Sequence, residues 1–156
     1  MPIPKMKIIS FNCNSLISHV RRHELAIFIK KHKPDIICLN ETKLSDRHNL
    51  LIENYLNFKT NTTQTRKGGI AILIKNNIVH SEPKCFSNTN YTATSGRIGN
   101  GRRSFMIFSV YFRKIIGTDL DYIFNLHDNI LMCGDFNAKH AMWNCITGNK
   151  YWEKTI

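Results

Sequence analysis

One short run decides how the whole sequence is interpreted: Leu131-Met132-Cys133-Gly134-Asp135-Phe136-Asn137. Its apolar first half is typical of a buried strand, and the glycine breaks the pattern. Residues two apart in an extended segment point to the same side, so we expect Asp135 and Asn137 to face one small group while Phe136 turns inward. A carboxylate can orient or deprotonate water, and a carboxamide can donate to a phosphate oxygen. The run therefore predicts a strand that carries chemistry at its end.

Other apolar runs predict further buried strands, and we expect them at Met6 to Phe11, Ile36 to Leu39, Ile70 to Ile74 and Ile130 to Cys133. Between Leu16 and Lys31, apolar residues recur near helical spacing until Pro34 stops the pattern; they are Val20, Leu25, Phe28 and Ile29. A strand, helix, strand unit is therefore expected by residue 42.

The second half of the chain predicts a hairpin, a short helix and a strand. The runs Tyr91 to Ile98 and Arg103 to Tyr111 flank Gly99-Asn100-Gly101, which is typical of a hairpin turn. Thr118-Asp119 is expected to cap a short helix that carries Leu120, Ile123, Phe124 and Leu126 on one side. Phe58-Lys59-Thr60 is a plausible partner for the strand after Gly68-Gly69. This inventory predicts one layered α/β or α+β domain over residues 1–156.

The charge balance favours a polyanionic partner. The 156 residues include 22 Lys and Arg against 11 Asp and Glu, and 42% are hydrophobic, enough for a real core. We therefore expect nucleic acid, and no membrane, as the partner. The alternative for any single basic cluster is a solvated surface.

The cysteines and the chain start bear on location. Five cysteines without a Cys-x-x-Cys pair are expected to be buried, reduced thiols. No apolar run approaches the roughly 18 residues of a membrane helix, and Met1-Pro2-Ile3-Pro4-Lys5 does not open a signal peptide. We expect an intracellular protein, nuclear or cytoplasmic, that is not secreted.

Polar side chains follow three of the predicted strands: Asn12 after the first, Glu41 after the second, and Asp135 with Asn137 after the last. Ends of neighbouring strands are where α/β sheets usually build sites. Carboxylate and amide oxygens suit Mg²⁺ or Mn²⁺ and are poor ligands for zinc. The set therefore suggests phosphate-ester chemistry. The alternatives are turn asparagines, a solvated Glu41, and an Asx-type turn at Asp135.

The order of the motifs resembles the endonuclease/exonuclease/phosphatase superfamily, and more narrowly the apurinic-like endonuclease domain of insect jockey-like non-LTR retrotransposons. The motifs are Ser10-Phe11-Asn12-Cys13-Asn14-Ser15, Leu39-Asn40-Glu41-Thr42-Lys43, Gly68-Gly69-Ile70-Ala71-Ile72-Leu73, Ser109-Val110-Tyr111, and Cys133-Gly134-Asp135-Phe136-Asn137-Ala138-Lys139-His140 with Trp143. The resemblance implies a deoxyribonuclease-like four-layered sandwich of two β-sheets flanked by helices.

The resemblance also implies roles for individual residues. Asn12 and Glu41 would help to hold Mg²⁺, and Tyr111 would contact the scissile phosphate. Asp135 would orient or activate the attacking water, and Asn137 would contact phosphate. These roles agree with the physics of a metal that neutralises charge on a transferring phosphate while a carboxylate aims the nucleophile.

Further candidates for nucleic-acid contact are Asn14, Arg66, Lys67, Lys139 and His140. Arg66 is the candidate for an arginine that relatives place near the double glycine. His140 fits a retroelement pattern, but it is not the family's catalytic histidine, and a structural hydrogen bond is the alternative role for it.

The chain departs from the resemblance at its end. Members continue to a late acidic ligand and a closing Asp-His pair, which this sequence lacks before Ile156. We therefore expect a domain incomplete at its C-terminus and weak or inactive by itself, because catalytic groups that act together are strongly non-additive.

The full-length activity implied is Mg²⁺-dependent nicking of DNA that supports target-primed reverse transcription, with DNA and the remainder of a reverse-transcriptase polyprotein as partners. The alternatives are a non-catalytic nucleic-acid-binding relic and another phosphoesterase of the superfamily.

Overall fold

A computed structural model describes residues 5–60, 68–139 and 146 of the chain. Its first sheet is mixed and has the strand order β1-β2-β4-β3. β1 and β2 are parallel, and β4 runs antiparallel to both β2 and β3. The strands are β1 (Ile8–Asn12), β2 (Ile36–Asn40), β3 (Tyr55–Thr60) and β4 (Ile70–Lys75). Each strand predicted in this half of the chain is present.

The second sheet is also mixed and has the order β5-β6-β7-β8. β5, β6 and β7 form an antiparallel meander, and β8 joins β7 in parallel. The strands are β5 (Lys84–Ser87), β6 (Tyr91–Ile98), β7 (Phe105–Phe112) and β8 (Ile130–Asp135). The hairpin of β6 and β7 is as expected, with a 3₁₀ turn at Gly101–Arg103, whereas β5 was not predicted.

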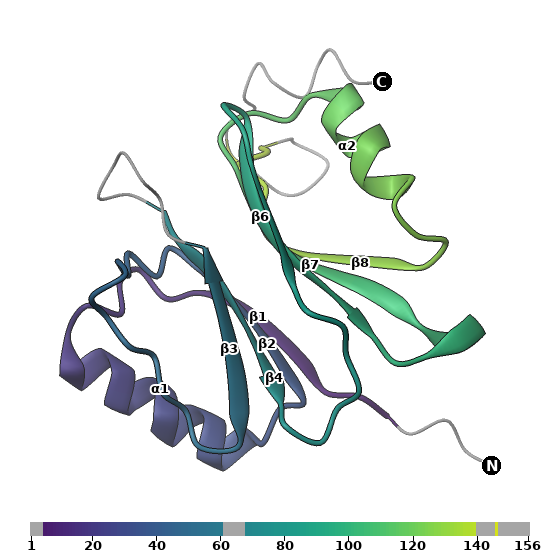
Figure 1. Ribbon diagram of the computed structural model, residues 1–156. Coiled ribbons are helices and arrows are strands. Elements are labelled where there is room, and N and C mark those ends of the chain that lie inside the picture. Colours follow the sequence, from purple (N-terminus) through teal and green to yellow (C-terminus); the bar gives the residue numbers. More distant parts are fainter. Residues whose placement is uncertain (1–4, 61–67, 140–145, 147–156) are drawn as a thin grey trace.

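The two sheets face each other, and a helix covers each outer face (Figure 1). Helix α1 (His19–His32) connects β1 to β2, and α2 (Gly117–Phe124) connects β7 to β8. Three apolar clusters fill the three interfaces: Leu25, Leu39 and Leu73 under α1, Phe108 and Ile123 under α2, and Ile36, Ile72 and Ile107 between the sheets. This four-layered α/β sandwich confirms the expected fold class.

Helix α1 begins later and buries less than its spacing predicted. Ser18 caps it by accepting a hydrogen bond from the Val20 backbone nitrogen, and Lys33 ends it in the left-handed region. Leu25 is buried as expected, but Val20 is 66% exposed and Phe28 lies at the margin of the core. The prediction for Val20 was wrong because Val20 precedes the buried Leu25 by five residues, which at 3.6 residues per turn places the two side chains on different faces of the helix.

Helix α2 is not capped by Thr118-Asp119. Its cap position is Ile116, which offers no side-chain acceptor, so the helix starts without a capping side chain. The Asp119 carboxylate instead accepts from the side-chain nitrogens of Asn88 and Asn90, which lie between β5 and β6. A tertiary contact has therefore replaced the local cap that the sequence predicted.

The cysteine prediction holds in part. The four cysteines in the described residues are free thiols, and Cys13 and Cys38 are buried. Cys85, however, is exposed because it lies on the edge strand β5. Cys145 lies outside the described residues. Neither α1 nor α2 is long and apolar enough to cross a membrane, and no other helix of the described part is.

Candidate active site

The carboxyl ends of four strands meet at one end of the sandwich. β1 is parallel to β2, and β8 is parallel to β7. Hydrogen bonds between the ends of β2 and β7 fix the two pairs together, from the Asn40 side chain to the Val110 carbonyl and from the Ser109 hydroxyl to the Leu39 carbonyl. This arrangement brings the polar residues of three sequence motifs to a common edge.

The first half of this edge belongs to β1 and β2. The side-chain nitrogen of Asn12 donates to Oε1 of Glu41 at 2.8 Å. The Asn12 side-chain oxygen accepts from the Asn14 backbone nitrogen at 2.9 Å, and the Asn14 side-chain oxygen accepts from Nζ of Lys43 at 2.9 Å. A carboxylate, two carboxamides and an ammonium group therefore form one connected cluster.

Backbone hydrogen bonds hold the loops that carry this cluster. The Ser15 nitrogen donates to the Glu41 carbonyl, and the Thr42 nitrogen donates to the Gly69 carbonyl. Gly69 has a φ of +83°, and a Cβ there would lie 2.6 Å from Oγ1 of Thr42. The double glycine is thus required for close approach to the Glu41 loop. Glu41 itself has a φ of +54°, an uncommon conformation for a residue with a side chain.

The second half of the edge belongs to β7 and β8. Tyr111 and Asp135 are direct partners in the parallel register, so their side chains emerge on the same face of the sheet. Ile107, four positions before Tyr111, and Cys133, two positions before Asp135, pack between the sheets. Alternation therefore turns Tyr111 and Asp135 toward the first sheet, and both are half-buried.

Asn137 does not follow the extended spacing that we predicted for it. β8 ends at Asp135, and Asn137 has a φ of +47°. Its backbone nitrogen donates to Oδ1 of Asp135 at 2.9 Å, and its side-chain nitrogen donates to the Phe112 carbonyl at 2.8 Å. The Asx-type turn is thus present, and the two side chains do not share one strand face. Phe136 turns inward as expected and stacks on Phe112.

The donor set of the first half fits a hard divalent ion. Glu41 is half-exposed, and its neighbours Asn12 and Asn14 offer amide oxygens without sulfur or imidazole ligands. Within residues 5–60, 68–139 and 146, no three His, Cys, Asp or Glu side chains gather closely enough to hold a metal. An ion at this edge would therefore depend on one carboxylate, amide oxygens and water.

The candidates for nucleic-acid contact fall into two groups. Asn14 and Lys139 are exposed at the same edge as the cluster. Arg66, Lys67 and His140 lie outside the described residues. The sequence reasoning missed Asn40, treated as a turn residue, and Lys43, which contacts Asn14. Two signals pointed to Asn40: it directly precedes Glu41, and an asparagine that ends a fully apolar run needs a buried partner.

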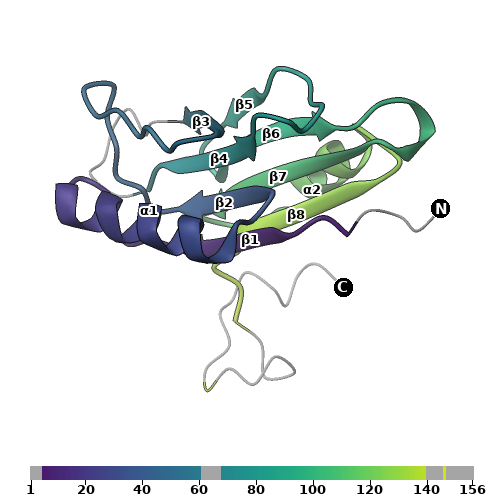
Figure 2. The same ribbon diagram turned by 90° about the horizontal axis from the view of Figure 1, so that it is seen from below.

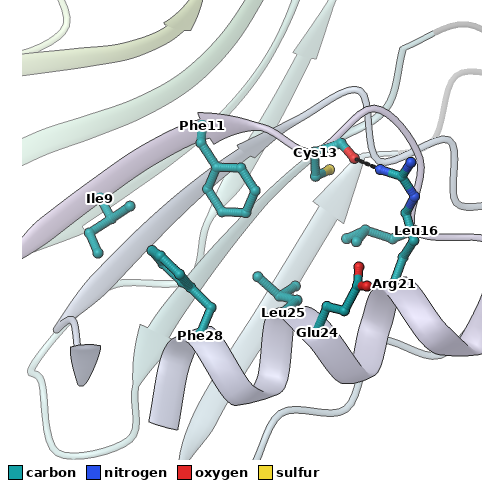
Figure 3. A pocket seen from close by; sticks show the side chains of 8 residues that line it. All are labelled: Ile9, Phe11, Cys13, Leu16, Arg21, Glu24, Leu25 and Phe28. Atoms are coloured by element: carbon teal, nitrogen blue, oxygen red, sulfur yellow. Dashed lines mark hydrogen bonds between the residues drawn. The ribbon is translucent and has the colours of Figure 1, made fainter. Parts of the chain in front are cut away.

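Two apolar hollows flank the edge. Figure 3 shows the first, a pocket of about 480 Å³ between β1 and α1, lined by Ile9, Phe11 and Phe28 among others. The second, about 720 Å³, lies beside Asp135 and is lined by apolar residues of α2 and β8. Burial raises the pKa of Cys13, at the rim of the first pocket, to about 11, and its thiol donates to the Asn40 carbonyl. A protonated thiol is a poor nucleophile, so the chemistry of this edge rests on oxygen groups.

Comparison with known proteins gives relatives among mobile elements. The chain is 25% identical over 148 residues to the RNA-directed DNA polymerase from mobile element jockey of Drosophila melanogaster, covering 92% of this chain and 16% of that protein. It is 23% identical over 133 residues to the probable RNA-directed DNA polymerase from transposon X-element of the same species, covering 81% of this chain and 15% of that protein. The chain thus spans about one sixth of these relatives.

Solved structures share the fold. The endonuclease domain of TRAS1, a telomere-specific non-LTR retrotransposon, superposes with a TM-score of 0.66 at 16% identity, covering 97% of this chain and 70% of that one. D. rerio TDP2 complexed with single strand DNA product gives a TM-score of 0.63 at 14% identity, covering 89% and 63%. The model of the endonuclease/exonuclease/phosphatase family matches residues 9–152. The chain therefore belongs to the endonuclease/exonuclease/phosphatase family, whose members are nucleases and phosphoesterases that generally use a divalent metal.

Proposed function

We propose that this chain carries the site of a Mg²⁺-dependent endonuclease that nicks one strand of DNA by hydrolysing a phosphodiester bond. The observation that carries the proposal is the pairing of two polar half-sites across the sandwich. Asn12 and Glu41 lie hydrogen-bonded at the end of the first sheet, and Tyr111 lies directly opposite Asp135 at the end of the second. A phosphate between them would meet both groups.

Each half-site has a distinct task in this proposal. The Glu41 carboxylate and the Asn12 amide oxygen would hold Mg²⁺, whose charge offsets the negative charge that develops on the phosphate. The Asp135 carboxylate accepts a hydrogen bond from a water and aims its oxygen at phosphorus. The Tyr111 hydroxyl donates to a non-bridging phosphate oxygen. Lys43, held beside this cluster by Asn14, adds positive charge close to the phosphate.

DNA is the substrate that the charge balance and the relatives support. The formal net charge of +11 favours a polyanion. A family neighbour, TDP2, was solved with a single strand DNA product, and the jockey relative is an RNA-directed DNA polymerase from a mobile element. By analogy with the jockey relative, we propose that the nick exposes a primer for reverse transcription by a polyprotein of which this chain forms part.

The test is nicking of supercoiled plasmid by the purified chain. We expect relaxed circles to form in Mg²⁺ and not in EDTA. Replacing the carboxylate by its isosteric amide in Asp135→Asn should lower the rate about 100-fold or more, because it removes the group that positions water. Glu41→Gln should raise the Mg²⁺ concentration needed for half-maximal rate, since it removes the one carboxylate of the first half-site.

The matched control is Asp121→Asn, which removes the same charge from the exposed face of α2. Its rate should equal that of the unchanged protein. Nicking that persists in EDTA or in Asp135→Asn would contradict the proposal. A folded chain that binds DNA without nicking it would favour the alternative of a binding protein without turnover.

A further inference from the structure

Residues of three strands, two of them fully buried, meet at one atom next to the candidate active site. The atom is the carbonyl oxygen of Val110 in β7. The Asn40 side chain at the end of β2 donates to it at 2.6 Å, and a Cβ placed on Gly134 in β8 would lie 2.0 Å from it. The three strands come from both sheets, so this contact joins the halves of the sandwich.

The residue that follows each member of this trio is a candidate site residue. Asn40 precedes Glu41, Val110 precedes Tyr111, and Gly134 precedes Asp135. A shift of one member by a few tenths of an ångström therefore moves the next residue directly. The contact therefore lies one peptide unit from Glu41, from Tyr111 and from Asp135, and it sets the separation between the two half-sites.

Because the contact is buried, losing its hydrogen bond would leave a polar group without a partner. Asn40 is 1% exposed and Val110 is fully buried, so water cannot replace the hydrogen bond between them. The Asn40 backbone carbonyl is also engaged, because it accepts from the backbone nitrogen of Cys13, next to Asn12. Asn40 is thus bonded to both half-sites, through its backbone to the first and through its side chain to the second.

We propose that Asn40 is a positioning residue that fixes the separation of Glu41 from the Tyr111 and Asp135 pair through the Val110 carbonyl. The proposal rests on the proposed function for its consequence, hydrolysis, but not for its geometry. Asn40 contacts neither substrate nor metal. Replacing Asn40 removes none of the reacting groups but changes the distance between them, which a reaction that needs aligned groups tolerates poorly.

A neighbouring hydrogen bond supplies the matched control. The Ser109 hydroxyl donates to the Leu39 carbonyl at 3.4 Å, also between β2 and β7 and also buried. It does not involve the Val110 carbonyl or Gly134. Ser109→Ala therefore removes a buried bond between the same two strands that is not one of the contacts of the Val110 carbonyl.

The experiment compares Asn40→Leu, Asn40→Asp and Ser109→Ala in the full chain, by plasmid nicking and by amide chemical shifts without metal or DNA. We expect Asn40→Leu to lower kcat about 10-fold to 100-fold, with DNA affinity within twofold of the unchanged protein. Ser109→Ala should stay within threefold in kcat. In spectra, Asn40→Leu should shift the Tyr111 and Asp135 amides, 70 or more residues away in sequence, and Ser109→Ala should shift them much less.

Asn40→Asp adds a pH readout that loss of packing alone would not give. A protonated carboxyl can donate to the Val110 carbonyl, whereas an ionised one repels it. The ratio of its rate to that of the unchanged protein should therefore rise as the pH falls from 8 to 5.5, while the ratio for Asn40→Leu stays flat. Should Asn40→Leu not fold, the shifts of Asn40→Asp between these two pH values carry the comparison.

The outcomes separate this proposal from the proposed function. Unchanged Tyr111 and Asp135 amides in Asn40→Leu, or equal shifts in Ser109→Ala, would overturn the positioning role whether or not the chain nicks DNA. A kcat that falls equally in both variants would also overturn it. An unchanged protein that never nicks DNA, with the expected shifts in Asn40→Leu, would refute the endonuclease and leave the positioning contact intact.

Discussion

At the scale of single residues, Gly134 has a backbone conformation and a close contact that exclude a side chain, and it directly precedes the candidate site residue Asp135. Its φ is +144°, and the carbonyl of Val110 occupies the space where a side chain would begin. Only glycine permits β8 to approach β7 so closely at this point. The glycine that breaks the apolar run is thus the residue that lets Asp135 lie opposite Tyr111.

We predict that Gly134→Ala destabilises the fold by about 3 kcal/mol or more, because strained backbone and a steric clash add together. The matched control is Gly101→Ala, whose φ of +63° is also positive but whose Cβ would meet nothing within 4 Å. It should cost about 1–2 kcal/mol, the penalty of the left-handed conformation alone. Urea denaturation measures both, and equal losses would contradict the clash.

The residue scale also shows where a local rule fails. The rule that residues two apart in a strand share a face applies to Cys133 and Asp135, which both lie in β8. The same rule failed for Asn137, because the strand ends at Asp135 and a turn follows. The local sequence is compatible both with an extended strand through Asn137 and with an Asx turn at Asp135, and the local pattern does not distinguish the two.

At the scale of elements, β2 and β8 contact each other between the two sheets through a pair of cysteines. Cys38 of β2 is fully buried, and Cys133 of β8 packs against the same apolar cluster. A hydrogen bond from the Cys38 thiol lowers the pKa of the Cys133 thiol, while the same bond and burial raise the pKa of Cys38. The Cys38 thiol on β2 is therefore the donor and the Cys133 sulfur on β8 the acceptor of this hydrogen bond.

We predict that iodoacetamide labels Cys133 faster at pH 7 than an ordinary thiol of equal exposure, because the lowered pKa increases the thiolate fraction. Cys38→Ala removes the donor, so the pH midpoint of Cys133 labelling should move upward. Cys38→Ser keeps a donor and should preserve the lower midpoint. Peptide-level mass spectrometry reads the rates, with exposed Cys85 as the internal reference.

Easier access to Cys133 in Cys38→Ala would speed its labelling at every pH, which differs from a shift of the midpoint. An unmoved midpoint in that variant would contradict the hydrogen bond between the two thiols.

At the scale of the whole molecule, two features stand out: the edge strands and the charge. Among the described strands, β1 and β8 each lie at one edge of their sheet, and they run side by side on one flank of the sandwich (Figure 2). The chain matches 70% of the TRAS1 endonuclease domain. An edge strand that no described strand covers offers backbone groups with which a further strand can associate.

The net charge predicts that DNA binding weakens steeply with salt. Each neutralised phosphate releases counterions, so a protein that contacts about two phosphates loses about tenfold in affinity between 50 and 200 mM salt. We expect at least this loss for a chain with a formal charge of +11, measured by fluorescence anisotropy with short duplexes of unrelated sequence. The affinity should vary little between sequences, because phosphate contacts carry no base information.

Affinity that ignores salt, or that depends mainly on sequence, would show that the basic residues are not the binding surface. The Lys43→Gln variant tests the contribution of the site itself. It should lower the DNA affinity more than Lys84→Gln does, which removes a charge from the edge strand β5.

The sequence by itself determined the strands that are fully buried, the hairpin, the presence of a helix after the first strand, and the motifs that mark the family. These features depend on the periodicity of apolar residues and on turn chemistry, both of which are local. The local pattern alone therefore predicts Glu41 and Asp135 as candidate site residues. What only the tertiary structure decided is which groups meet: Asn12 with Glu41, Asn40 with Val110, Asp119 with Asn88 and Asn90. Each of these contacts joins segments separated by some thirty to seventy residues, and their partners are fixed by how the two sheets pack, which no local pattern encodes.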